Sequence, residues 1–258
     1  MTLHRRQIFS VVSFGALLTL AFGSMPSEEE MAKDKAEKEA LWQERKAQLA
    51  AVHGAVAAVD LRNVSAEACD VPTLAARIDE QVIKKEYGKV DLPHAQLSFL
   101  ARFASDDPAA FTKEKGDFYW LTDMVFFTRF DDLKSDGTQP AESDWKWAID
   151  ELWEKRFMVV FVPDPGAQNV SPVARTEDDI TWGELTAYAF LVGLDDATIH
   201  CQGRFTAESS DEIEWEEGAI LSDGSAGEAL HNDFARNVEQ AVAPLVGKPL
   251  GIDISWWR

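Results

Sequence analysis

A short basic segment and a long apolar run open the chain, and they limit where the rest of the protein can fold. Arg5 and Arg6 precede 15 almost uninterrupted apolar residues, Ile8 to Phe22. This length lies between the apolar part of a signal peptide, about 7–15 residues, and a transmembrane helix, about 17–25 residues. We therefore expect residues 1–25 to form an export signal or a membrane anchor, with the remainder of the chain outside the cytoplasm.

Two questions about this segment stay open in the sequence. The small residues of Ala21-Phe22-Gly23 fit a cleavage site before Ser24, which would release the chain into the periplasm. Without cleavage, the same segment would anchor the protein in the membrane, facing the periplasm or the exterior. Arg5-Arg6-Gln7-Ile8-Phe9 resembles the core of a twin-arginine signal, but ordinary export signals also place basic residues before the apolar run.

The composition changes abruptly after the apolar run. Residues 27–62 are rich in Ala, Glu and Lys and contain no proline, which favours a helix. Ser27 and Glu30 fit a capping box, in which each side chain satisfies a backbone amide at the start of the helix. We therefore predict a charged helical spacer over residues 26–62.

One face of this spacer helix carries apolar residues at heptad spacing. The face either packs on the following domain or pairs with a second copy as a coiled coil over residues 42–59, which would make the protein an oligomer. The residues of this stripe are Trp42, Leu49, Val52, Val56 and Val59.

The net charge of −20 is concentrated in residues 63–258, which carry 37 acidic and 17 basic residues. This balance argues against a nucleic-acid partner, because binding phosphates requires a basic surface. Anionic lipid headgroups also repel an acidic domain, so attachment to the cytoplasmic membrane should depend on residues 8–25 alone.

The hydrophobic pattern of residues 63–258 predicts an α+β domain. Helices come first, followed by a hairpin, a helix and a strand, so we expect helices packed on a mostly antiparallel sheet. Residues 118–130 are rich in aromatic side chains and fit either a strand or a helix. The predicted helices begin at Asp70 and span 97–104, 145–153 and 225–247, and the predicted strands span 157–162, 183–193, 197–206 and 252–256.

The predicted strand at 197–206 has the clearest alternation in the chain. It places Ile199 and Cys201 on one face and His200 on the other, so His200 and Cys201 should not form a base and nucleophile pair. An exported chain with two cysteines allows a disulfide between Cys69 and Cys201. Two separately buried thiols are the alternative.

No set of residues has the spacing of a catalytic, metal or cofactor site. The histidines form no i, i+4 pair, and each Asp-Asp pair lies beside a predicted turn, where Asp side chains bond local amides. The acidic run at 208–217 lacks the fixed glycine and alternating ligands of an EF-hand loop. Trp256 and Trp257 point to opposite faces of the last predicted strand, and the exposed one is our candidate for contact with a partner.

The stretch Phe161–Val246, about a third of the chain, resembles a pattern found in uncharacterised exported bacterial proteins. The pattern combines a strand, a loop with a glycine, a hairpin with an inward Cys201, then Phe205, Ala207 and Ser209-Ser210, and an amphipathic last helix. The resemblance implies export and supplies no catalytic residues.

These observations predict a protein of the cell envelope that is exported or membrane-anchored and has a non-catalytic binding or structural role. Its expected contacts are the cytoplasmic membrane, through the N-terminal segment, and an envelope partner of unknown identity. Two alternatives remain. One is a periplasmic hydrolase that uses Asp and Glu as acid and base on glycans, and the other is an envelope oligomer held together by a coiled coil.

Overall fold

The computed structural model describes residues 27–64, 89–90, 92–107, 118, 121–122, 127, 155–176, 179–211, 225–246 and 253–254. Several sequence predictions lie outside these ranges. They are the N-terminal apolar segment, the helix beginning at Asp70, the helix at 145–153, most of 118–130, Cys69, and Trp256 with Trp257.

Helices and a mixed sheet of four strands make up the described part, in agreement with the expected α+β class. The chain order is α1 (Glu28–Ala57), the 3-10 helix η1 (Leu61–Asn63), β1 (Lys89–Val90), β2 (His94–Gln96), α3 (Leu97–Ala104), β3 (Phe157–Pro163), β4 (Val173–Thr176), β5 (Asp179–Thr181), β6 (Glu184–Gly193), β7 (Ile199–Glu208), α6 (Ser225–Val246) and β8 (Asp253–Ile254).

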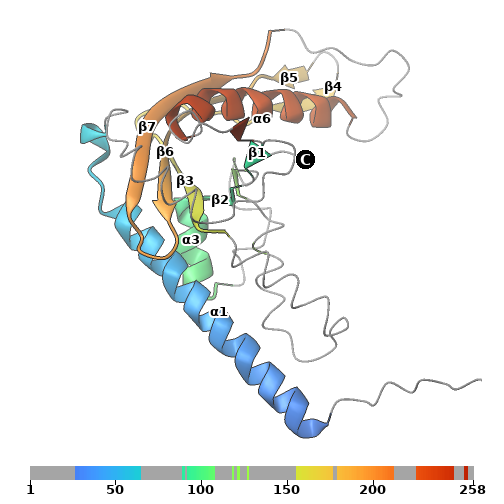
Figure 1. The fold of residues 1–258 in the computed structure, drawn as a ribbon. Helices are drawn as coiled ribbons and strands as arrows, with labels where there is room; N and C mark the ends of the chain where they lie inside the picture. Colours follow the sequence, from blue (N-terminus) through green and yellow to red (C-terminus); the bar gives the residue numbers. More distant parts are fainter. Residues whose placement is uncertain are drawn as a thin grey trace, which may run out of the picture.

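The four strands of the main sheet lie in the order β2-β3-β6-β7. β3, β6 and β7 run antiparallel to their neighbours, whereas β2 pairs in parallel with β3. Two further pairs are small: β1 with β8, in parallel, and β4 with β5, antiparallel. In Figure 1, α6 lies across one face of the sheet, while α1 and α3 lie on the opposite face.

Strand β3 separates two hydrophobic clusters. Its sequence is apolar throughout, as expected of a strand that is buried on both faces. Phe157, Val159 and Phe161 enter the cluster beneath α6, whereas Met158 and Val160 enter the cluster beneath α1 and α3. All five side chains are at most 1% exposed. Each such burial contributes about 1.5–3 kcal/mol relative to an exposed side chain.

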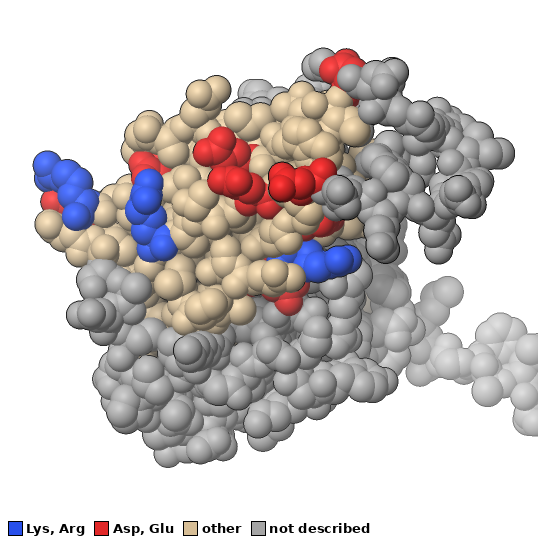
Figure 2. Space-filling model, turned by 90° about the horizontal axis from the view of Figure 1, so that it is seen from above, with Lys and Arg blue, Asp and Glu red and all other residues tan. Residues whose placement is uncertain are grey.

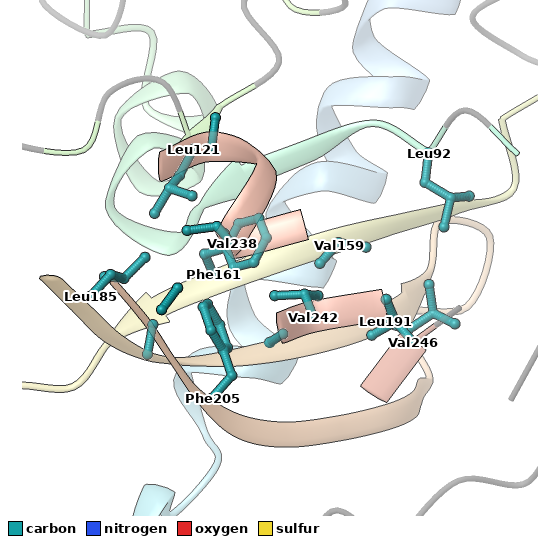
Figure 3. Close-up of a cluster of buried hydrophobic side chains, with 14 of the residues drawn as sticks. Leu92, Leu121, Val159, Phe161, Leu185, Leu191, Phe205, Val238, Val242 and Val246 are labelled. Atoms are coloured by element: carbon teal, nitrogen blue, oxygen red, sulfur yellow. The ribbon is translucent and has the colours of Figure 1, made fainter. Parts of the chain in front are cut away.

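The cluster beneath α6 is drawn in Figure 3. Val238 and Val242 from α6 face Phe161 and Phe205 from the sheet, and the two phenyl rings meet edge to face with centroids 6.0 Å apart. The apolar stripe expected for the last helix is therefore confirmed, and its members Leu230, Phe234, Val238 and Val242 are all fully buried.

Helix α1 is docked for about half of its length. The capping box is confirmed, because the Ser27 hydroxyl accepts from the Glu30 amide and the Glu30 carboxylate accepts from the Ser27 amide. Beyond the exposed first turns, the predicted stripe becomes buried against α3 and the sheet. The second half of α1 thus packs on the rest of the fold, which is the first of the two uses that the sequence leaves open for its apolar face. The buried stripe consists of Trp42, Arg45, Leu49, Val52 and Val56.

Three short strands, β2, β4 and β5, are not among the predicted elements. β4 and β5 pair with each other between β3 and β6, and β2 follows Pro93 and pairs with β3. Strands of three or four residues show too few alternations for a period to be recognised. These short strands are stabilised by tertiary contacts, since β4 packs against α6 and β2 packs against β3.

The hairpin of β6 and β7 confirms the predicted strand pair but shifts its details. β7 begins at Ile199, because Ala197 adopts a left-handed conformation with φ 54° in the turn. The register slips between Leu191 and Val192, which pair with Cys201 and Ile199, so His200 is the extra residue of a β-bulge.

Candidate functional site

Strand β7 places Cys201 beneath α6, in the cluster of Figure 3. The residue is 0% exposed and its sulfur is disulfide-bonded. The only other cysteine of the chain, Cys69, lies outside the described residues. A sulfur held in a disulfide is not available as a thiolate, so Cys201 in this state has a structural role rather than a nucleophilic one.

The predicted separation of His200 and Cys201 on opposite faces is wrong. His200 packs edge-on against Phe157, with ring centroids 5.4 Å apart, and Phe157 belongs to the same cluster as Cys201. Ile199, expected on the face of Cys201, packs instead against the cluster beneath α1 and α3. The bulge causes both changes, because one extra residue reverses the alternation of side chains on either side of it.

A polar junction joins the end of β7 to α6; it consists of Ser209, Ser210, Asp233 and Asn237. The Ser210 hydroxyl donates to Asp233 Oδ1 at 2.7 Å, and the Ser210 backbone amide donates to Oδ2 of the same carboxylate at 2.8 Å. Asn237 donates to the Ser210 hydroxyl at 3.1 Å and to the carbonyl of Glu208 at 2.9 Å. These hydrogen bonds connect two side chains of α6 with the backbone and side chain at the end of β7.

The chemistry of the polar junction favours attachment over catalysis. A nucleophilic serine needs a base and also amide donors aimed at the developing oxyanion. The amide of Ser210 donates to the Asp233 carboxylate instead, as the Ser210 hydroxyl does. Both hydrogen-bond donors of Ser210 therefore hold α6. Ser209 adds a second link, because its hydroxyl accepts from the Gly183 amide at 2.9 Å.

A second polar set lies where β3 ends and joins the loop after it to β6 and β7. Asp164 accepts from the Gly166 amide at 2.9 Å and from Arg204 Nε at 3.0 Å. These hydrogen bonds hold the pKa of Asp164 below its ordinary value, and the bond from the Gly166 amide has the largest effect. The Tyr188 hydroxyl lowers the pKa further. Thr186 extends the set through a hydroxyl contact of 3.2 Å with Thr206.

Arg45 is the large charged side chain that α1 brings into the core. It is 1% exposed, and its guanidinium donates to the carbonyl of Lys155 over 3.5 Å. Burial lowers the pKa of Arg45 to about 10, opposed by the nearby Asp195 carboxylate, so the group stays charged at neutral pH. Asp195 is itself paired with Arg156 at 3.1 Å.

Several acidic side chains gather on the described surface on the side of α6. Figure 2 views this side from above, and acidic side chains gather over its middle while basic ones lie toward the margins. Helix α6 carries Glu228, Asp233 and Glu239 against a single Arg236. Within the described ranges, no group of three or more His, Cys, Asp or Glu side chains is placed to hold a metal ion.

Exposed apolar side chains are few in the part of the chain that the structure describes. Trp182 is 43% exposed and Val173 is 40% exposed, on and beside the β4–β5 pair. Isolated apolar side chains of this kind are normal on protein surfaces. The predicted partner contact at Trp256 and Trp257 lies outside the described residues.

Local sequence patterns do not predict these polar sets. Asp233 and Asn237 are four residues apart on one helix, but nothing in the chain marks Ser210 as their partner. Nothing in the sequence connects Asp164 with Arg204, which lies 40 residues further along the chain. The sequence places Arg45 on the heptad stripe of Trp42 and Leu49, but it does not predict that this charged side chain is buried.

Among the described helices, none is long and apolar enough to cross a membrane. In comparisons with family models, curated proteins and solved structures, nothing matches the chain.

Proposed function

We propose that this chain is a cell-envelope protein, exported through or held at the cytoplasmic membrane by residues 1–25. Its α+β domain would then act outside the cytoplasm in a non-catalytic binding or structural role. The observation that carries the proposal is the disulfide at Cys201. Disulfides persist in oxidising compartments such as the periplasm, whereas the cytoplasm of most bacteria keeps thiols reduced.

The partner of Cys201 in this proposal is Cys69, since the chain has two cysteines. Joining them closes a long loop, which stabilises a folded domain by about 4–5 kcal/mol in the chain-entropy model. The bond and the basic, apolar N-terminal sequence are independent features, and both favour a location outside the cytoplasm.

The non-catalytic part of the proposal is supported by what the polar sets do. The polar junction fastens α6 to β7, and Asp164 fastens a loop to β7 through Arg204. In each case the hydrogen-bonding groups are directed at other parts of the fold. Acidic side chains gather on the described surface over α6, so the envelope partner would be basic or carry bound cations.

Cell fractionation combined with thiol labelling tests the proposal. We expect the full chain in the membrane or periplasmic fraction, with both cysteines resistant to alkylation until a reductant is added. A matched variant lacking residues 2–25 should stay in the cytoplasm with both thiols open to alkylation after unfolding. Finding the full chain in the cytoplasm with free thiols would contradict both the location and the role of the disulfide.

A further inference from the structure

We propose that two copies of this chain pair through the outer edge of β7, in an antiparallel arrangement centred on Thr206. The main sheet has the order β2-β3-β6-β7, so among the described strands β7 pairs only with β6. Pairing of β7 with a second β7 across a two-fold axis would join the two four-stranded sheets into one continuous sheet. The inference does not depend on where the protein is located, and it goes beyond the proposed function.

The backbone of β6 shows which groups of β7 point outward. Glu184 and Thr186 use their amides and carbonyls to bond the loop after β3, on the side away from β7. Their partners across the ladder are Glu208 and Thr206. In an antiparallel ladder, such pairs exchange no hydrogen bonds with each other, so the amides and carbonyls of β7 point away from β6 at these positions. The same alternation directs the backbone groups of Arg204 outward.

These outward groups are accessible to a second strand. Arg204, Thr206 and Glu208 are exposed, and the side chain of Arg204 is 53% exposed. Of their outward backbone groups, only the Glu208 carbonyl has a partner among the described residues, the side-chain amide of Asn237. A carbonyl oxygen can accept a second hydrogen bond. An open strand edge of this kind pairs readily with another strand unless charges or a bulge prevent it.

The exposed charges on this edge are complementary to themselves. Arg204 and Glu208 lie two residues before and two residues after Thr206. An antiparallel copy centred on Thr206 therefore places Arg204 directly opposite Glu208 of the second copy, once on each side of the axis. Opposite charges that face each other stabilise a strand pair, whereas like charges destabilise it. The charges that discourage other strands thus favour a second copy of this one.

The neighbouring residues on β6 fit the same arrangement. Glu184 lies opposite Glu208, so Glu208 has a like charge on one side and would gain an opposite charge on the other. The hydroxyls of Thr186 and Thr206 are 3.2 Å apart, and the two-fold axis would extend this pair into a row of threonines from both copies. Arg204 donates within its own chain through Nε, and its two Nη groups can donate to the carboxylate of the second copy.

Exchanging the charges on the edge tests the pairing. The full chain is purified in a density-matched detergent, and sedimentation equilibrium measures its dissociation constant. We expect a dimer with a dissociation constant of about 10–100 µM, since a short strand pair buries little area. Arg204→Glu should weaken the dimer by about tenfold or more, because like charges then face each other on both sides of the axis. Combining Arg204→Glu with Glu208→Arg should restore the dissociation constant to within about threefold.

Glu208→Arg alone should weaken the dimer by a similar factor, and it keeps the bond from Arg204 to Asp164. This variant replaces Arg204→Glu if circular dichroism shows that Arg204→Glu is unfolded. Arg236→Glu is the matched control, because it changes the net charge by the same amount at an exposed position of α6. The control should leave the dissociation constant within about twofold, since α6 is outside the strand pair.

Three results would overturn the inference. The first is a monomer at every concentration. The second is a dimer that the single exchanges leave intact, because another surface would then hold the copies together. The third is a dimer that is lost in the single exchanges and does not return in the double exchange, because the charges would then not face each other about Thr206.

Discussion

The ring of Phe234 lies flat against the backbone of Gly183. A Cβ atom at position 183 would come within 3.0 Å of three ring carbons, Cγ, Cδ1 and Cδ2. The backbone there has little freedom to retreat, since the Gly183 amide donates to the Ser209 hydroxyl and its carbonyl accepts from the Ser209 amide. The missing side chain at this position allows α6 to approach the start of β6.

The substitution Gly183→Ala is therefore expected to lower the free energy of unfolding by about 1–3 kcal/mol, the usual cost of overpacking a closed contact. Urea denaturation measures it. Gly54→Ala is the matched control, because a Cβ at position 54 meets nothing within 4 Å in the interior of α1. The control should raise the free energy of unfolding by up to about 1 kcal/mol. Equal effects of the two substitutions would show that Phe234 does not press on Gly183.

Leu49→Ala tests whether α1 is part of the core. Leu49 is 0% exposed in the cluster shared with α3, so its truncation should lower the free energy of unfolding by about 2–5 kcal/mol. Met31→Ala, on the half of the helix where Met31 is 52% exposed, should change it by less than about 0.5 kcal/mol. If Leu49→Ala proves as mild as Met31→Ala, the second half of α1 is a free spacer, and its stripe is available for a coiled coil.

Arg45 separates the effects of buried charge and buried volume. Arg45→Met keeps most of the packing of the side-chain stem and removes the cost of burying a guanidinium, so we expect a change within about 1 kcal/mol. Arg45→Ala also loses the stem and should lower the free energy of unfolding by about 2–3 kcal/mol. Thermal unfolding of the two variants measures the difference. Equal losses would indicate that the guanidinium itself, through Lys155 and Asp195, holds α1 in place.

Asp164 should contribute to acid sensitivity. The pKa of Asp164 is lowered in the folded protein, so its contribution is fully present above the ordinary carboxyl pKa of about 4 and is lost as the pH falls through the lowered value. Asp164→Asn should therefore be less stable than the unchanged chain at pH 7, and should lose less stability between pH 4 and pH 2. The effect is modest because Arg204 is 53% exposed. Parallel pH profiles of the two chains would contradict this assignment.

Much of the fold could be predicted from local patterns that the tertiary structure reinforces. The uninterrupted apolar sequence of residues 157–162 predicted the strand β3, and Ser27 with Glu30 predicted the start of α1. The stripe of α6 identified the face that now covers the sheet. In these elements, the residues that the sequence pattern places on the apolar face are the residues that are buried in the structure.

The remaining features depend on contacts between distant parts of the chain. The bulge at His200 arises because the residues on either side of it pair with Leu191 and Val192 of β6. No residue type in β7 predicts this bulge. β4 and β5 are too short for a period and rely on α6 for support. The link from Ser210 to Asp233 spans 23 residues, so its partners could be found only after α6 was placed on the sheet.

Strand β3 contributes alternate side chains to both hydrophobic clusters, and this has a consequence for heat denaturation. Neither cluster can melt while the other stays ordered, because Met158 and Val159 are neighbours on one backbone. Calorimetry of the folded domain should therefore record one cooperative transition, and damage to either cluster should lower the same melting temperature. The helices α1 and α6, on opposite sides of the sheet, should therefore unfold in the same thermal transition.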